Sequence, residues 1–231
     1  PAKSATASER GKADVLASLM SDGALKEKDA KDLKSAPIAP TPLCLLFGQG
    51  HQHFLERFRD VPLDLPEPLK RGKGRQVVTV STAECISESL FAAWHRSDSS
   101  FSFRWDPEED VRYALMAGDP AASTYKLGTQ HGANQLAAVG LAALTAVPET
   151  RLGQTRLSIL GESFGKDGFS ISWPIWKIPA TFSAIRSMLD HPDLQKKDGL
   201  ANLSVDHVLT ARRISVGKFM NFTRGMTVYM E

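Results

Sequence analysis

The sequence predicts an α+β protein in which helices mix with short antiparallel strands and a helical N-terminal segment comes first. Three observations predict this class. Apolar residues recur at helical spacing in several stretches, β-branched residues cluster in others, and no regular strand–helix–strand repeat is present. The 231 residues are 42% hydrophobic and 23% charged, with a formal net charge of +2. The chain can therefore bury a core, and its charge does not by itself demand nucleic acid.

The first segment is rich in lysine, aspartate, alanine and serine, and it is predicted to be helical with one apolar face at residues 15–19. Three prolines in "SAPIAPTP" (35–42) end it, because proline cannot occupy a helix interior. The sequence therefore predicts two parts, a helical N-terminal segment over residues 1–36 and an α+β domain over residues 37–231.

The first elements of the domain follow from local patterns. "PLCLLF" (42–47) predicts a buried strand or helix start, and a helix is expected to begin near His51. A proline-rich and then basic loop comes next. "QVVTV" (76–80) predicts a strand from its β-branched content.

Two strong helices are predicted after that strand. In "STAECISESLFAAWHRS" (81–97), Ser81 or Thr82 with Glu84 forms a capping box. The expected apolar face of this helix comprises Ile86, Leu90, Phe91 and Trp94. "HGANQLAAVGLAALTAV" (131–147) is apolar almost all round, so it predicts a buried helix.

The last third of the domain alternates strands and helices. "TRLSILGES" (155–163) and "GFSISWPIW" (168–176) predict the two strands of a hairpin. Helices are expected in "TFSAIRSMLD" (181–190) and "LSVDHVLTARRI" (203–214). The stretches "RISVGKF" and "MTVYM" predict short strands that close the domain.

The acidic stretch "FRWDPEEDVRYALMAGDP" (103–120) is typical of a helix start. Asp106 can cap the helix, a proline follows in the first turn, and the acids through Asp110 complement the positive end of the helix dipole. The alternative is a divalent-metal site, and with it a metal-dependent nuclease that uses Asp106, Glu108 and histidines. That alternative needs convergent oxygen ligands from elsewhere in the chain.

The stretch "GESFG" (161–165) matches the nucleophile elbow of serine hydrolases, with Ser163 as the nucleophile and His191 or His207 as candidate bases. A helix must follow such an elbow, but "KDGFSISWP" predicts a turn and another strand. A β-hairpin turn is therefore the better interpretation.

Two further features bear on the class of protein. Cys44 and Cys85 have no CxxC partner, which favours reduced, buried thiols and a cytoplasmic protein. The longest apolar stretch, residues 133–147, is too short to span a bilayer, so no membrane association is expected. No residue pattern calls for a cofactor or a resident metal.

Basic and uncharged polar clusters are the strongest functional signals. The loop "LKRGKGRQ" combines Lys70, Arg71, Lys73 and Arg75 with two glycines within six residues, a flexible basic arrangement suited to phosphates. A second cluster interleaves basic residues with aromatics, which suits single-stranded or A-form backbones, and comprises Arg212, Arg213, Lys218, Asn221 and Arg224. Gln130, His131 and Asn134 begin the buried helix and could contact a base edge, or else cap the helix and satisfy buried backbone.

Five stretches, in this order, resemble segments of a CRISPR-associated protein of type I-U (also called I-G) loci: "LLFGQGHQHFLERF", "FRWDPEEDVRYALMAGDP", "HGANQLAAVGLAAL", "FSISWPIWKIP" and "ARRISVGKFMNFT". The resemblance runs from about Pro42 to Thr223. It implies a large-subunit-like or associated subunit of a crRNA-guided surveillance complex (Cascade), whose partners are crRNA or target DNA and other effector subunits. The resemblance also implies that such subunits are not themselves nucleases. Sequence reading is delegated to base pairing, while the protein reads backbone shape and a short flanking motif.

On this resemblance the protein is a non-catalytic nucleic-acid-binding subunit in antiviral defence. The two basic clusters become phosphate contacts, and Arg104 and Arg112 flank the capped helix of the acidic stretch as further contacts. Two alternatives remain open at this point: an enzyme of the nuclease or serine-hydrolase kind, and a protein-interaction scaffold without nucleic-acid contact of its own.

Overall fold

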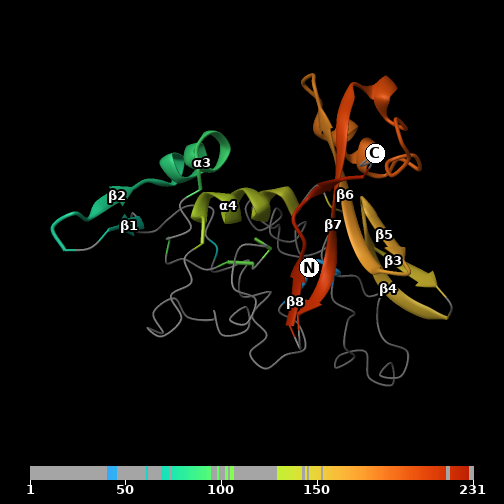
Figure 1. Ribbon diagram of the computed structural model, residues 1–231, viewed down its shortest axis with the longest axis horizontal. Coiled ribbons are helices and arrows are strands. Elements are labelled where there is room, and N and C mark those ends of the chain that lie inside the picture. The colour runs from blue at the N-terminus through green and yellow to red at the C-terminus, as the bar shows by residue number, and fades with distance from the viewer. Residues whose placement is uncertain are drawn as a thin grey trace, which may run out of the picture. The chain divides into compact units, whose positions relative to one another are not determined.

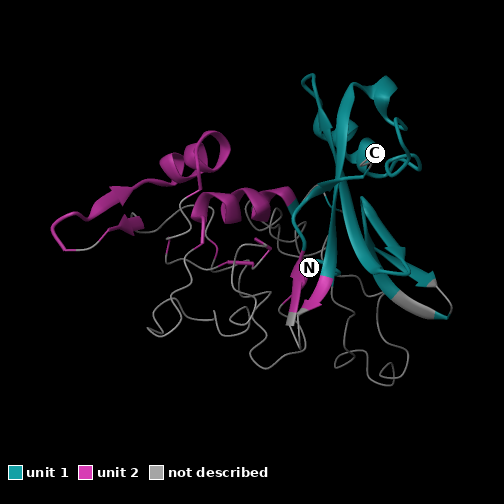
Figure 2. Ribbon diagram, viewed as in Figure 1, with its two compact units in different colours: residues 1–43, 141–213, 223–231 teal, residues 44–140, 214–222 magenta. Residues whose placement is uncertain are grey.

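The structure is a computed structural model that describes residues 41–45, 61, 69–72, 74–94, 98, 102–103, 105–106, 129–141, 144, 146–151, 153–216 and 219–228. The chain divides into two compact units (Figure 2). Unit 1 takes residues 1–43, 141–213 and 223–231, and unit 2 takes residues 44–140 and 214–222. The stretch expected to form one α+β domain is thus divided in two. The predicted N-terminal helical segment and the helices expected near His51 and after Asp106 lie outside the described residues.

The α+β class is confirmed, because the described residues contain both helices and short antiparallel strands (Figure 1). The helices are α3 (Thr82–Phe91), α4 (His131–Gly140) and α5 (Phe182–Leu189), with a 3-10 turn at Ala201–Leu203. The strands are β1 (Leu69–Arg71), β2 (Val78–Val80), β3 (Ala146–Arg151), β4 (Gln154–Ile159), β5 (Glu162–Gly165), β6 (Gly168–Trp176), β7 (Val205–Val216), β8 (Phe219–Phe222) and β9 (Met226–Thr227).

Unit 2 begins its described part with an antiparallel hairpin of β1 and β2. Leu69 faces Val80 and Arg71 faces Val78 in its register. The connecting turn contains Gly72 and Gly74, whose φ angles of +100° and +61° are conformations that glycine adopts without a steric penalty. The basic stretch expected as a loop is therefore part of a hairpin, and β2 confirms the C-terminal end of the strand expected over 76–80.

Helix α3 starts with the predicted capping box, which the structure confirms. The Glu84 N–H donates to Ser81 Oγ at 3.3 Å, and the Ser81 N–H donates to Glu84 Oε2 at 2.7 Å. Helix α4 packs on α3 at Gly132. A Cβ atom at Gly132 would overlap the Cys85 carbonyl oxygen and would lie 2.5 Å from Ser89 Oγ. Glycine at this position therefore sets the close approach of the two helices.

The apolar face predicted for α3 is wrong. Cys85 is the buried residue of this helix, while Leu90, Phe91 and Trp94 are 57%, 83% and 42% exposed. The physical reason is that α4 approaches α3 along the side of Cys85 and Ser89, so the large apolar side chains point away from the contact. The core of unit 2 is built instead around Cys44, Val61, Phe103 and Ala138, with Trp105 stacked on Phe103 at 4.6 Å.

Unit 1 contains two antiparallel sheets. Strands β3 and β4 form one, and the other has the order β5-β6-β7-β8, with β9 also paired to β7. The C-terminal end of β7 and all of β8 are counted with unit 2. Strands β5 and β6 are joined at Lys166 and Asp167, where Gly168 has a φ of +90°. Of the hairpin predicted between 155–163 and 168–176, the second strand is confirmed as β6, but the prediction is wrong for the first. Residues 155–159 belong to β4, which pairs with β3, and the hairpin partner of β6 is β5.

Two predicted helices differ from the structure. The helix expected over 131–147 ends at Gly140, and β3 begins at Ala146. The helix expected over 203–214 is strand β7, which pairs with β6 from Trp176–Val205 to Ser170–Arg212. Valine and threonine in this stretch are β-branched, and ladder hydrogen bonds on both sides decide the conformation against the helical spacing.

The core of unit 1 lies beside α5, whose prediction is confirmed. The helix is capped by Thr181, whose Oγ1 accepts a hydrogen bond from the Ala184 N–H at 3.2 Å. Its Met188 packs with Leu194 and Leu200 in a buried cluster. Partly buried residues surround this cluster: Ala180, Ile185, Val205 and Val208.

Candidate nucleic-acid interface

Hairpin β1–β2 carries exposed basic side chains. Lys70 and Arg75 are both exposed, and Val77 and Val78 beside them are 46% and 61% exposed. Within unit 2 the hairpin extends beyond α3 and α4 (Figure 1). Both described cations are therefore open to solvent. Lys73, predicted as a third phosphate contact, lies outside the described residues.

Arg71 has a different place from its basic neighbours. Its Nε and Nη2 donate to Asp98 Oδ1 and Oδ2 at 2.6 and 2.9 Å, and Nη2 also lies 2.7 Å from Glu88 Oε2. The Asp98 side chain is fully buried and the Arg71 side chain is 17% exposed. The hydrogen bond to Asp98 raises the pKa of Arg71, and burial opposes it. We refer to Arg71, Glu88 and Asp98 together as the hairpin clamp.

The hairpin clamp extends into the start of α4. The backbone of Asp98 exchanges two hydrogen bonds with Thr129, at 3.1 and 2.9 Å. The His131 N–H donates to Asp98 Oδ2 at 3.1 Å, and Gln130 Nε2 donates to Glu88 Oε2 at 3.2 Å. A buried carboxylate with this many partners is fixed in position. The base of the hairpin is thus held to α3 and to the start of α4.

Arg71 therefore differs from the phosphate contact predicted from the sequence. Its guanidinium group is already paired with two carboxylates and is largely buried, which makes it a poorer phosphate contact than its exposed neighbours. The geometry makes Arg71 a positioning residue that fixes the hairpin carrying Lys70 and Arg75. The sequence separation of 27 residues between Arg71 and Asp98 leaves no local signal for this pairing.

The uncharged polar residues at the start of α4 face the interior. Gln130, His131 and Asn134 are 1%, 0% and 9% exposed. Asn134 Oδ1 accepts from the Phe103 N–H at 3.2 Å, and its Nδ2 donates to Thr129 Oγ1 at 2.8 Å. These contacts match the alternative weighed from the sequence, namely capping and satisfying buried groups. As placed, the three side chains offer no surface to a base edge or groove.

Burial disfavours the charged form of His131. Burial lowers the pKa of His131, and the positive charge of Arg71 lowers it further by a smaller amount. The negative charge of Asp98 acts in the opposite direction and raises it. Neither ring nitrogen has a hydrogen-bond partner among the described residues. A charged imidazole would be costly at such a site.

The two adjacent arginines of the C-terminal basic cluster, Arg212 and Arg213, have different surroundings. Arg212 is 47% exposed and lies 3.3 Å from Asp167, whereas Arg213 donates to the Pro42 carbonyl at 3.0 Å and lies over the Phe169 ring. Neighbouring residues of a strand point to opposite faces, so the two arginines separate. Asn221 is buried, Arg224 is exposed, and Lys218 lies outside the described residues, as do Arg104 and Arg112.

The residues named for the two enzyme alternatives, a serine hydrolase and a metal-dependent nuclease, lie partly within the described residues. Ser163 lies within β5 and is followed by the turn to β6, so the strand–turn–helix context of a nucleophile elbow is absent at this serine. Asp106 is half-buried, and Glu108 lies outside the described residues. Among the residues that the structure describes, no three His, Cys, Asp or Glu side chains come together as a metal site would require.

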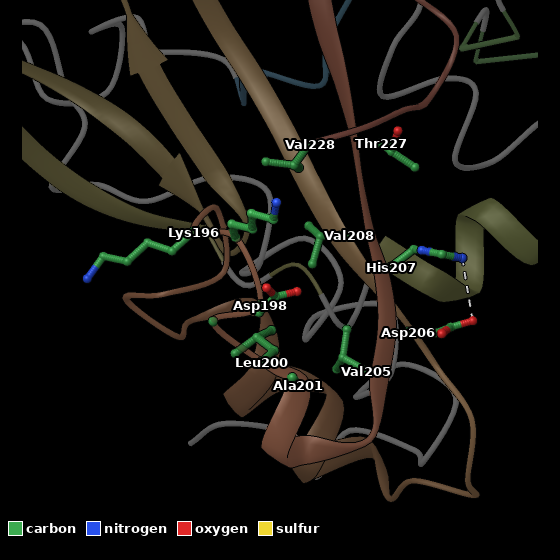
Figure 3. A pocket seen from close by; sticks show the side chains of 12 residues that line it. Lys196, Asp198, Leu200, Ala201, Val205, Asp206, His207, Val208, Thr227 and Val228 are labelled. Carbon is green, nitrogen blue, oxygen red and sulfur yellow. Dashed lines mark ion pairs between the residues drawn. The ribbon is translucent and has the colours of Figure 1, made fainter. Parts of the chain in front are cut away.

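The two histidines considered as bases lie on unit 1. His191 Nδ1 accepts from the Asp193 N–H at 3.1 Å. His207 lies 3.4 Å from Asp206 in an open cleft of about 270 Å³, which Figure 3 shows with Lys196 and Asp198 on its wall. A hydrogen bond from Lys177 lowers the pKa of Asp206, so this carboxylate is charged and already paired.

An apolar groove of about 410 Å³ lies beside α5 in the same unit. Among its lining residues, Trp176, Ile178 and Leu203 are 37%, 56% and 47% exposed. Contiguous exposed apolar surface of this kind is typical of contact with another molecule. Apart from Leu203, its lining residues come from residues 176–191, a stretch that carries no recognisable binding motif.

No protein-family model matches the chain, and searches of the curated proteins and of the solved structures found no match. None of the helices in the described part of the chain has the length and apolar character needed to cross a bilayer. The chemistry of the exposed hairpin thus remains the principal indication of function in the described residues.

Proposed function

We propose that this chain binds nucleic-acid backbone through hairpin β1–β2, as a non-catalytic, cytoplasmic subunit of a crRNA-guided type I CRISPR surveillance complex. The observation that carries the proposal is the pair of exposed cations, Lys70 and Arg75, on a hairpin whose base is held by buried ion pairs.

Phosphate binding suits this geometry for a physical reason. Lysine and arginine side chains on an exposed arm neutralise phosphates and release their counterions, whatever the base sequence. A hairpin with a fixed base orders its cations before the ligand arrives, so less conformational entropy is lost on binding. The hairpin clamp provides that order, because Arg71 joins β1 to Asp98 and to α3 at distances of 2.6 to 2.9 Å.

Membership of an effector complex is supported by the order of the five stretches that resemble a type I-U protein. It is also supported by the apolar groove beside α5, which offers a neighbouring subunit a surface to bury. On this proposal the nucleic-acid ligand is crRNA or target DNA, and the groove contacts another effector subunit.

The proposal is tested with a charge-reversed hairpin variant, Lys70→Glu/Arg75→Glu. Its control is Lys166→Glu/Lys197→Glu, which changes the charge by the same amount at exposed positions of unit 1. Fluorescence anisotropy measures binding to labelled single-stranded RNA, single-stranded DNA and duplex DNA across a salt series.

We expect the wild-type affinity to fall steeply with salt. The hairpin variant loses two phosphate contacts, so the slope of log K against log salt should decrease in magnitude by about 1.4 to 1.8. The control should bind nearly as the wild type does. Equal losses in the two variants would indicate nonspecific electrostatics and refute the assignment to the hairpin, and salt-insensitive binding would refute a phosphate interface.

A further inference from the structure

We propose that the bound ligand is single-stranded and that one of its bases stacks on Phe91, beside the hairpin that holds its phosphates. This inference rests on the proposed function and names the ligand class for the same site. Phe91 is the last residue of α3 and is 83% exposed. A phenyl ring left this open to water has nearly its whole face available to a partner.

The hairpin clamp brings the end of α3 that carries this ring close to strand β1, which carries Lys70. Arg71 on β1 lies 2.7 Å from Glu88 on the last turn of α3. Lys70 adjoins Arg71, and Phe91 follows Glu88 by three residues, which places Glu88 and Phe91 on neighbouring parts of the helix surface. The base of the hairpin and the exposed end of α3 are therefore adjacent.

The chain around Phe91 is ordered by its own contacts. The Trp94 indole N–H donates to the Ser89 carbonyl oxygen at 2.9 Å, which folds the residues after the helix back onto its last turn. The Ala92 N–H donates to the Glu88 carbonyl at 3.0 Å. Leu90 and Trp94 extend the apolar surface around the ring, with 57% and 42% of their surfaces exposed.

An aromatic ring beside exposed cations is the arrangement that single-stranded nucleic acid requires. Its bases are unstacked and can lie on an aromatic face, while its phosphates contact lysine and arginine. In a duplex the bases are already stacked on one another, so Phe91 would add little. The cations of the adjacent hairpin favour this polyanion over an uncharged apolar partner.

The decisive experiment combines a protein substitution with a change in the ligand. Phe91→Ala is compared with Phe182→Ala, a matched control on α5 of unit 1 where the phenylalanine is 52% exposed. Each protein is titrated with a labelled single strand, with the same backbone lacking its bases, and with a duplex. Both positions are exposed, so neither substitution is expected to prevent folding.

We expect Phe91→Ala to weaken binding of the single strand by about 5- to 150-fold, the range for loss of one base–aromatic stack. Binding of the baseless strand and of the duplex should change less than about twofold, and Phe182→Ala should change none of the three. If Phe91→Ala weakens binding only when the strand carries bases, the losses in binding free energy from the two changes are not additive. That result would identify stacking as the cause.

Three results would overturn the inference, and they are distinguishable from failure of the proposed function. Unchanged single-strand binding by Phe91→Ala, with loss in Lys70→Glu/Arg75→Glu, would leave the phosphate interface intact without stacking. Equally weakened binding of all three ligands would mean that Phe91 maintains the structure of the hairpin base and does not stack on a base of the ligand. If the wild type self-associates in sedimentation velocity and Phe91→Ala does not, with unchanged nucleic-acid binding, the exposed end of α3 is a protein contact instead. Absence of binding to every ligand would refute the function and the inference together.

Discussion

Substitution of Asp98 by asparagine tests the hairpin clamp directly. The change removes the negative charge and keeps the shape of the side chain, which is fully buried between Arg71 and the start of α4. We expect it to destabilise unit 2 and to release the base of the hairpin.

The magnitude follows from the contacts that Asp98 makes. The carboxylate accepts two charge-assisted hydrogen bonds from Arg71 and one from the His131 N–H. Replacing a charged acceptor by a neutral one costs about 1 kcal/mol per hydrogen bond to Arg71. The asparagine amide must also direct an N–H₂ group toward a donor, which adds about 1 to 2 kcal/mol. Since Glu88 remains as a partner of Arg71, we expect a total of about 2 to 4 kcal/mol, near the lower end for a broken buried ion pair.

Urea denaturation at neutral pH, followed by tryptophan fluorescence, measures this loss, and hydrogen exchange over residues 69–80 reports the hairpin separately. The control is Glu149→Gln, which breaks a pair with Arg156 in which the glutamate side chain is 45% exposed, and it should lose at most about 1 kcal/mol. A loss for Asp98→Asn no larger than that of the control, with unchanged exchange in the hairpin, would refute the reasoning.

Two further predictions concern helix α4. Gly132→Ala should destabilise the protein by about 1 to 3 kcal/mol in the same denaturation assay, because the alanine Cβ would collide with the Cys85 carbonyl. Gly140→Ala is the matched control: its Cβ would enter open space, so it should stabilise the protein by up to about 1 kcal/mol. His131 is buried and its pKa is lowered, so the unfolded state binds the proton more readily and stability should fall as the pH drops below about 6.5. Denaturation midpoints between pH 7.5 and 5.5 should therefore decline more steeply for the wild type than for His131→Gln; equal slopes would contradict this.

Local patterns predicted those elements whose cause is local. The capping box of Ser81 and Glu84 spans four residues, and the patterns that predicted the helix over 181–190 and the strand β6 are equally short-range signals. Each was correctly placed because the interacting groups lie within one turn or one strand of each other.

The errors arise where tertiary contacts decide. Strand β7 has apolar residues at helical spacing, but pairing with β6 and β9 makes it extended. Helix α3 has its large apolar residues on one side, yet α4 packs on the other because Gly132 permits a close approach there. A single sequence does not show which face a neighbour will cover.

The candidate site divides in the same way. Composition alone identified the basic stretch that carries Lys70 and Arg75, because a run of cations between glycines is visible in the sequence. It could not separate Arg71 from them, since that distinction depends on a carboxylate far along the chain. Residue type likewise singled out Gln130, His131 and Asn134. Their burial fits capping and satisfying buried groups, and not contact with a base edge.

The pairing of β6 with β7 has a consequence for how the sheet of unit 1 assembles. Strands β5 and β6 are joined by a two-residue turn, so they can meet within microseconds, whereas β7 meets β6 only after residues 177–204 have been looped out. That loop contains α5 and the cluster of Met188, Leu194 and Leu200, which packs against Val205 and Val208 at the start of β7. Burial of this small cluster favours closure of the loop. We therefore expect loop closure to set the folding rate of the sheet.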